Sequence, residues 1–150
     1  MVTISDLITA VSFGNFIQRA FAHFGTERTW IFFFTLVKND EQGAYTLEIG
    51  EIVFRWEKEP AEDYENQAKI IAANYKSNLS RIIEFMHTDI QEMYGNISLE
   101  EIEEKLGKPM IDIDNGQVTY CEQTFDDIHI FSFEFLDDEF NEMQYFSIDG

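Results

Sequence analysis

The side chains best suited to chemistry in this chain are carboxylates that gather toward its C-terminus. They form two groups in the sequence, Asp126 with Asp127 and then Asp137, Asp138, Glu139 and Glu142. Convergent carboxylates bind hard divalent cations, and an acidic surface also attracts basic proteins. Both groups fall in segments expected to join strands, where acidic side chains are commonly just solvated. Three interpretations therefore stay open: a metal site, a partner-binding surface and ordinary loop chemistry.

A calcium loop is the most specific metal pattern to test, and it would begin at Asp112. The sequence there reads Asp-Ile-Asp-Asn-Gly. A calcium loop of the EF-hand type needs glycine at its position 6 and a bidentate glutamate at its position 12. Counted from Asp112, the glycine is fifth and the twelfth residue is Gln123. The pattern therefore fails, and Asn115-Gly116 is better interpreted as a two-residue type I′ turn. We expect no cofactor.

A cysteine nucleophile is the second arrangement to consider. His129 could pair with Cys121 or Glu122 across a hairpin, and nucleophilic catalysis needs such a proton-transfer contact. The strand parity around Cys121 instead predicts a small residue buried in the core. Because Cys121 is the one cysteine of the chain, no intramolecular disulfide can form, and this favours a reducing, cytoplasmic location.

The balance of charge narrows the class of partner. The chain has 29 acidic and 10 basic residues, a formal net charge of −19. Residues 96–150 alone hold 15 acidic residues against Lys105 and Lys108. Such a charge disfavours nucleic acid and anionic membranes as partners and attracts basic proteins. The sequence also lacks a run of about 18 uncharged apolar residues, so no membrane-spanning segment is predicted.

The elements that would position these residues begin with an N-terminal helical segment. Apolar residues at helical spacing predict a helix over residues 3–24, although a strand over part of 16–24 competes with it. Residues 29–37 are aromatic and β-branched, as in a central strand, and residues 44–57 form its return strand. Gly50 marks a switch of parity in that strand, which indicates a β-bulge.

A long helix comes next in the sequence. An apolar stripe whose spacings alternate between three and four residues predicts a helix over residues 60–94, with its weakest stretch at residues 74–80. Ser98 opens a capping box for a short helix over residues 98–106. Four further strands are predicted, at residues 110–114, 117–125, 128–136 and 144–148.

The predicted fold class is α+β. An antiparallel sheet, made of the N-terminal hairpin plus a C-terminal meander, would pack against the long helix, with the helical segment at the N-terminus. The chain supplies ample material for a core, with 45% apolar residues and 15 phenylalanines. We therefore expect a single domain over residues 1–150.

The C-terminal third carries one more pattern. A Ser-Leu-Glu-Glu helix start at Ser98 leads into the Asp-Asn-Gly turn, followed by Phe-Ser-Phe-Glu-Phe from Phe131 and a final Phe-Ser-Ile-Asp-Gly that ends at Gly150. In this order the chain resembles a group of small acidic bacterial proteins of unknown function, which has no agreed catalytic residues. Being small, acidic and poor in cysteine, it is also similar in type to immunity proteins that neutralise bacterial toxins.

Charge and resemblance together suggest a non-enzymatic, cytoplasmic bacterial protein that neutralises a basic toxin, such as a nuclease, by direct contact. An acidic surface can occupy the cationic surface with which a nuclease holds its substrate. The two acidic groups would form the contact if they gather on one exposed face, with Tyr120 and Tyr145 as aromatic anchors. One alternative is a structural or regulatory domain that dimerises through the stripe over residues 60–94, so the chain would be a monomer or a homodimer. The other is a divalent-metal-dependent enzyme.

Overall fold

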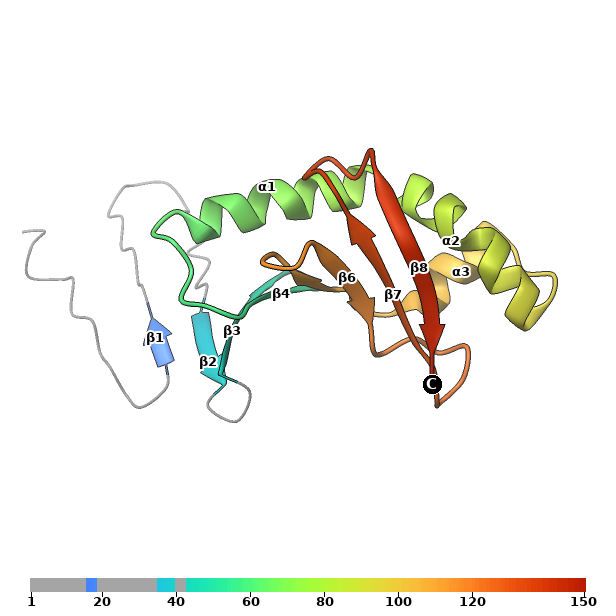
Figure 1. Cartoon of the computed structure of the whole chain (residues 1–150), viewed down its shortest axis with the longest axis horizontal. Coiled ribbons are helices and arrows are strands. Elements are labelled where there is room, and N and C mark those ends of the chain that lie inside the picture. The colour runs from blue at the N-terminus through green and yellow to red at the C-terminus, as the bar shows by residue number, and fades with distance from the viewer. Residues whose placement is uncertain (1–15, 19–34, 40–42) are drawn as a thin grey trace, which may run out of the picture.

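The structure is a computed structural model that describes residues 16–18, 35–39 and 43–150. Within these residues the predicted α+β class is confirmed: eight strands form one sheet, in which spatial order follows sequence order from β1 to β8. Neighbouring strands are antiparallel, except that β4 and β5 are parallel. Three helices connect these two parallel strands and lie along one side of the sheet (Figure 1).

The strands are β1 (Phe16–Gln18), β2 (Thr35–Asn39), β3 (Ala44–Ile49), β4 (Ile52–Trp56), β5 (Met110–Asp112), β6 (Gln117–Tyr120), β7 (Ile130–Phe135) and β8 (Met143–Asp149). The helices are α1 (Tyr64–Ser77), α2 (Leu79–Tyr94) and α3 (Leu99–Leu106). Because parallel neighbours need a long crossover, the three helices between β4 and β5 follow directly from the parallel pairing.

One face of the sheet is apolar and packs under the helices. A row of paired residues crosses five strands on this face, and each of its members is almost completely buried: Leu47, Phe54, Ile111, Val118 and Phe133. Strand side chains alternate between the two faces, so this row fixes which residues point toward the helices. It forms the floor of the core.

The opposite face of the sheet carries polar side chains. The adjacent row of paired residues reads Thr46, Arg55, Asp112, Gln117, Glu134 and Gln144. At its centre Asp112 is buried and forms an ion pair with Arg55, which compensates the cost of removing that carboxylate from water. The sheet is therefore amphipathic, with its apolar face toward the helices.

The single long helix predicted over residues 60–94 is wrong, because the structure has two helices that meet at Asn78. The break falls within the stretch 74–80 that was predicted to be weakest. The Asn78 side chain donates to the carbonyl oxygen of Asn74 at 2.9 Å, which satisfies a carbonyl at the end of α1. Gly95 ends α2 with a φ of 84°, a conformation that glycine adopts without strain.

The apolar stripe of α1 and α2 faces the sheet of the same chain. Ile71, Ile82, Ile83, Met86 and Ile90 are all buried in the core. The proposed dimer was expected to use this stripe. Since these residues are already covered within one chain, they are not free to pair with a second copy.

The N-terminal elements differ from the predicted ones. Residues 16–18 form a strand, so the helix predicted over 3–24 is wrong there and the competing strand is right. The rest of that helix, and residues 29–34 of the next predicted strand, lie outside the described residues. The remaining part of that strand coincides with β2.

The return strand predicted over residues 44–57 is two strands rather than one. Ile49 pairs with Ile52, so Gly50 and Glu51 form a two-residue hairpin turn and not a β-bulge. Gly50 has a φ of 63°, which is favourable for glycine at the first position of such a turn. The change in the alternation of apolar residues at Gly50 therefore marks a hairpin turn, where the chain reverses its direction.

The C-terminal elements follow the predicted order with shorter strands. The capping box of α3 is confirmed, since Glu101 N donates to Ser98 Oγ and Ser98 N donates to the Glu101 carboxylate. The two-residue turn predicted at Asn115-Gly116 is wrong, because β5 and β6 are joined by four residues, 113–116. The Asp112 carboxylate accepts from Asn115 N at 3.0 Å and so closes this wider loop.

Candidate functional site

The second acidic group lies in the loop between β7 and β8, which Asp137 organises. Its carboxylate accepts hydrogen bonds from the backbone N–H groups of Glu139 at 3.0 Å, Asn141 at 3.1 Å and Glu142 at 2.7 Å. Partial burial alone would raise the pKa of Asp137, but these donors outweigh it and hold the pKa below its usual value. Asp137 therefore has a structural role inside its own loop.

The other carboxylates of this loop face solvent. Asp138, Glu139 and Glu142 are exposed, and none of the ion pairs among the described residues involves them. The loop backbone is fixed in place, since Asn74 of α1 donates to the carbonyl oxygen of Asp138 at 3.0 Å. These three carboxylates are thus available to a partner on a loop that is already ordered.

The first acidic group lies in the loop between β6 and β7, where Asp126 accepts several hydrogen bonds. Tyr94 Oη donates to Asp126 Oδ2 at 2.5 Å, and His129 Nδ1 lies 2.6 Å from the same oxygen. The backbone N–H groups of Ile128 and His129 donate to Asp126 Oδ1. The Tyr94 hydroxyl and these other donors hold the pKa of Asp126 well below its usual range. Burial and the Asp126 carboxylate raise the pKa of Tyr94.

Gln123 holds the same loop from inside. Its side-chain amide donates to the carbonyl oxygens of Asp126 at 2.9 Å and His129 at 2.8 Å, and its oxygen accepts from Phe125 N at 2.7 Å. A buried amide with its donors and acceptor satisfied in this way fixes the loop conformation. Asp126 is therefore occupied within the molecule, and Asp127 is the exposed carboxylate of this pair.

The two acidic groups do not gather in one cluster. They lie in the loops at the two ends of β7 (Figure 1), and six strand residues at roughly 3.3 Å per residue separate them. The expected single cluster of carboxylates is replaced by two. Strand β8 runs back from the second loop toward the first.

The two predicted aromatic anchors have opposite environments. Tyr120 is completely buried, and its hydroxyl lies 2.7 Å from that of Tyr75, so the prediction that it contacts a partner is wrong. Its place on β6, opposite Phe131 on the apolar face, is the reason. Tyr145 on β8 is 73% exposed and is free to contact a partner.

The cysteine–histidine arrangement does not form. Cys121 is exposed, so the prediction that it is a buried core residue is wrong: it follows the last residue of β6, where the chain leaves the sheet. Cys121 and His129 line the same hollow of about 390 Å³, but no hydrogen bond joins them. His129 is directed instead to Asp126 and Tyr94. Proton transfer from the thiol has no partner in this geometry.

No group of three or more His, Cys, Asp or Glu residues is arranged to hold a metal ion in the part of the chain that the structure describes. Asp112, the first residue of the tested calcium pattern, pairs with Arg55. Asp114 accepts from the backbone N–H groups of Glu57 at 2.8 Å and Lys58 at 3.3 Å. Both carboxylates therefore join β4 to the loop after β5.

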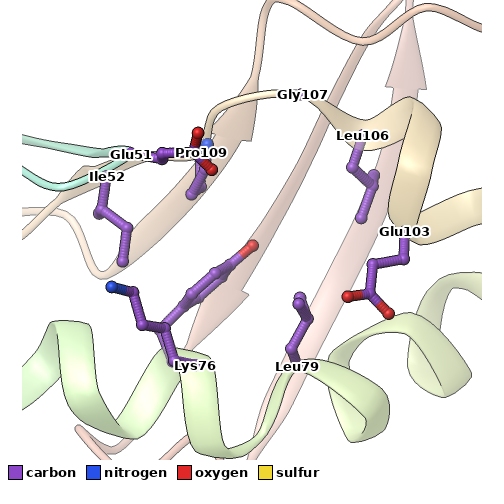
Figure 2. Close-up of a pocket in the computed structure, with 9 residues that line it drawn as sticks. Glu51, Ile52, Lys76, Leu79, Glu103, Leu106, Gly107 and Pro109 are labelled. Atoms are coloured by element: carbon purple, nitrogen blue, oxygen red, sulfur yellow. The ribbon is translucent and has the colours of Figure 1, made fainter.

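A cleft of about 220 Å³ lies where the junction of α1 and α2 meets α3 and the β3–β4 turn. Figure 2 shows Lys76 and Glu51 on one side of it and Glu103 on the other, where Leu79 and Leu106 also lie. Tyr75 also lines it, and burial raises the pKa of Tyr75 to about 12. The cleft therefore presents charges of both signs beside a tyrosine whose hydroxyl is kept protonated by burial.

A second hollow, of about 300 Å³, lies between α2 and β8 and was not predicted. Its lining consists of Asp89, Glu92, Met93, Phe146 and Ile148. Met93 belongs to the apolar stripe that predicts the helix over residues 60–94, but it is 51% exposed. Helical spacing gives both Met93 and Tyr94 a place near that stripe, and Tyr94 is the one that turns inward.

Comparison with known proteins finds no matching family model, no matching curated protein and no matching solved structure. Among the described residues, no helix is both long enough and apolar enough to cross a bilayer. The function must therefore be argued from the charges and surfaces of this chain.

Proposed function

We propose that this chain is a binding protein for a basic protein partner, most concretely an immunity protein that neutralises a basic bacterial toxin such as a nuclease. The observation that carries the proposal is the amount of uncompensated negative charge. The net charge is −19, and the exposed carboxylates of both loops form no ion pairs among the described residues. These exposed carboxylates belong to Asp127, Asp138, Glu139 and Glu142.

A cationic protein gains from this arrangement in two ways. The field of the whole chain steers it to the surface and raises the association rate. On contact, it places lysine and arginine side chains against carboxylates that form no ion pair among the described residues, although Arg81 already reaches the second loop and donates to Asn141 Oδ1 at 2.7 Å. The loops that present these carboxylates are held by Asp137 and by Gln123, so little ordering is needed on binding.

The test is to measure binding to the product of the adjacent gene, if that product is a basic protein, by calorimetry over a series of salt concentrations. We expect the affinity to fall steeply between about 50 and 300 mM salt because the screening length of exposed charges shortens from roughly 14 Å to roughly 6 Å over this range. If that protein is a nuclease, its activity should be lost at one equivalent of this chain. Absence of binding at low salt would reject the proposal, and an affinity that does not change with salt would reject its electrostatic basis.

A further inference from the structure

The groove between α2 and β8 combines an apolar floor with an acidic rim. Met93, Phe146 and Ile148 supply the floor, and Asp89 and Glu92 are exposed along α2 at the rim. Neither rim carboxylate takes part in an ion pair among the described residues. Strand β8 is also the last strand of the described sheet, so this groove opens at the edge of the fold (Figure 1).

Tyr145 directly precedes the groove residue Phe146 in the sequence and has an unusual backbone conformation. The pairing of β7 with β8 shifts between Ser132 and Glu134, so that Tyr145 and Phe146 together oppose Phe133 in a β-bulge. Tyr145 has a φ of 54°, which is an outlier for a large side chain. Its ring is 73% exposed. An exposed aromatic ring held on a strained backbone is typical of a binding position.

The two acidic loops lie at opposite ends of this edge strand. Strand β8 begins after the loop of Asp137 to Glu142 and ends beside the loop of Asp126 to His129, where the Gly150 backbone approaches Ile128 and His129. The groove therefore lies between the two acidic loops, and its own rim adds Asp89 and Glu92. A partner seated on β8 contacts the rim carboxylates directly, whereas exposed carboxylates more than about 10 Å away act on it only weakly because salt screens them.

We propose that this groove, together with Tyr145, is the surface on which the basic partner docks. The matching segment of the partner carries an apolar side chain flanked by lysine or arginine: the apolar group fills the floor, the cations pair with Asp89 and Glu92, and Tyr145 stacks against an aliphatic stem or guanidinium group. The bulge interrupts the edge of β8, so recognition uses side chains and not the addition of a strand. This inference rests on the proposed function.

A peptide probe tests the groove without knowledge of the partner. The probe is Lys-Arg-Phe-Lys-Arg, and its matched control is Lys-Arg-Ser-Lys-Arg. Titration into the isotope-labelled full chain, followed by NMR, should move the amide signals of Met93, Tyr145, Phe146 and Ile148. The phenylalanine peptide should bind about tenfold more tightly, since burying the ring contributes roughly 1.4 kcal/mol or more. Equal affinity of the two peptides, or shifts confined to other acidic segments, would overturn the inference.

Two variants test the groove with the basic protein of the adjacent gene. Tyr145→Gly should weaken binding about 30-fold, as expected for an aromatic hot spot, and glycine accepts the positive φ. Glu92→Lys should weaken binding more than Glu59→Lys, which makes the same charge change at an exposed position between β4 and α1, far along the sheet from β8.

The outcomes separate the two proposals. If the wild-type chain binds that protein and the Glu92→Lys and Glu59→Lys variants bind equally well, the groove is the wrong surface and the proposed function stands. If the wild-type chain does not bind it, the proposed function fails. The peptide titration then decides on its own whether the groove accepts a cationic segment with an apolar centre.

Discussion

Two positions, one inside the β7–β8 loop and one in β8, adopt the same unusual backbone conformation in opposite environments. Phe140 in the loop and Tyr145 in the bulge are the two non-glycine residues with positive φ in the described chain, at 56° and 54°. Phe140 is completely buried and packs its ring against Tyr75 and Phe135. Tyr145 is mostly exposed and makes no such ring contact within the described residues.

The two environments show what offsets the free-energy cost of a left-handed backbone conformation. A left-handed residue costs roughly 1–2 kcal/mol, whereas complete burial of a phenylalanine contributes about 1.5–3 kcal/mol. Burial therefore offsets the strain at Phe140 within the chain itself. At Tyr145 no burial of the ring within the described structure offsets the strain. We infer that a partner provides this burial.

The largest change in stability that tests this comparison is expected for substitution of Phe140. Phe140→Ala should lower the free energy of unfolding by about 3–5 kcal/mol, because it leaves a cavity between α1 and β7. Urea denaturation measures it, and Tyr145→Ala is the matched control, since it truncates an aromatic ring on the same backbone conformation. Similar losses in the two variants would contradict the distinction between a buried and an exposed position.

A smaller loss of stability is expected for substitution of Asp137, whose hydrogen bonds fix the loop that contains Phe140. Asp137→Ala removes the acceptor of three backbone N–H groups. Because water reaches this loop and replaces part of the lost bonding, the cost should be about 1–2 kcal/mol. Asp138→Ala is the control: its carboxylate is exposed, and the change should stay within about 0.5 kcal/mol. Equal effects at both positions would show that the loop does not depend on Asp137.

The same carboxylate makes the loop sensitive to pH. The pKa of Asp137 is lowered in the folded state, so its stabilising effect is present above the unfolded value of about 3.9 and is lost as pH falls below it. The stability difference between the wild-type chain and Asp137→Asn should therefore be larger at pH 7 than at pH 3. Urea denaturation at the two pH values checks this, and a difference that grows toward pH 3 would reverse the assignment.

Local chemistry explains what could be predicted from the sequence. The capping box at Ser98, the end of the predicted helix at Tyr94 and the strand within residues 128–136 depend on neighbours in the chain, and the structure has all of them. The weak stretch around Asn78 likewise became the junction of two helices. These features need no knowledge of what packs against them.

Features that depend on distant partners were missed. Gly50 gives the same parity switch whether it lies in a bulge or in a hairpin turn, and only pairing with the rest of the sheet distinguishes the two. Tyr120 is buried because β6 is central, and Cys121 is exposed because β6 ends before it. For the candidate site, the exposure of Tyr145 could be anticipated, whereas Asp89 and Glu92 matter only because β8 lies beside α2.

The smallest predicted effect tests the strain at Tyr145 directly. Tyr145→Gly and Tyr145→Ala remove the same exposed ring, but only glycine adopts a φ of 54° without steric cost. We expect the glycine variant to be more stable than the alanine variant by about 1 kcal/mol, because relief of the strain exceeds the extra entropy that glycine loses on folding. Thermal denaturation of the two proteins measures the difference. If alanine is the more stable of the two, Tyr145 is not strained, and the contrast with Phe140 no longer supports a partner at this edge. If glycine is the more stable and also binds the basic partner more weakly than wild type, then tyrosine at this position costs stability and its ring serves binding.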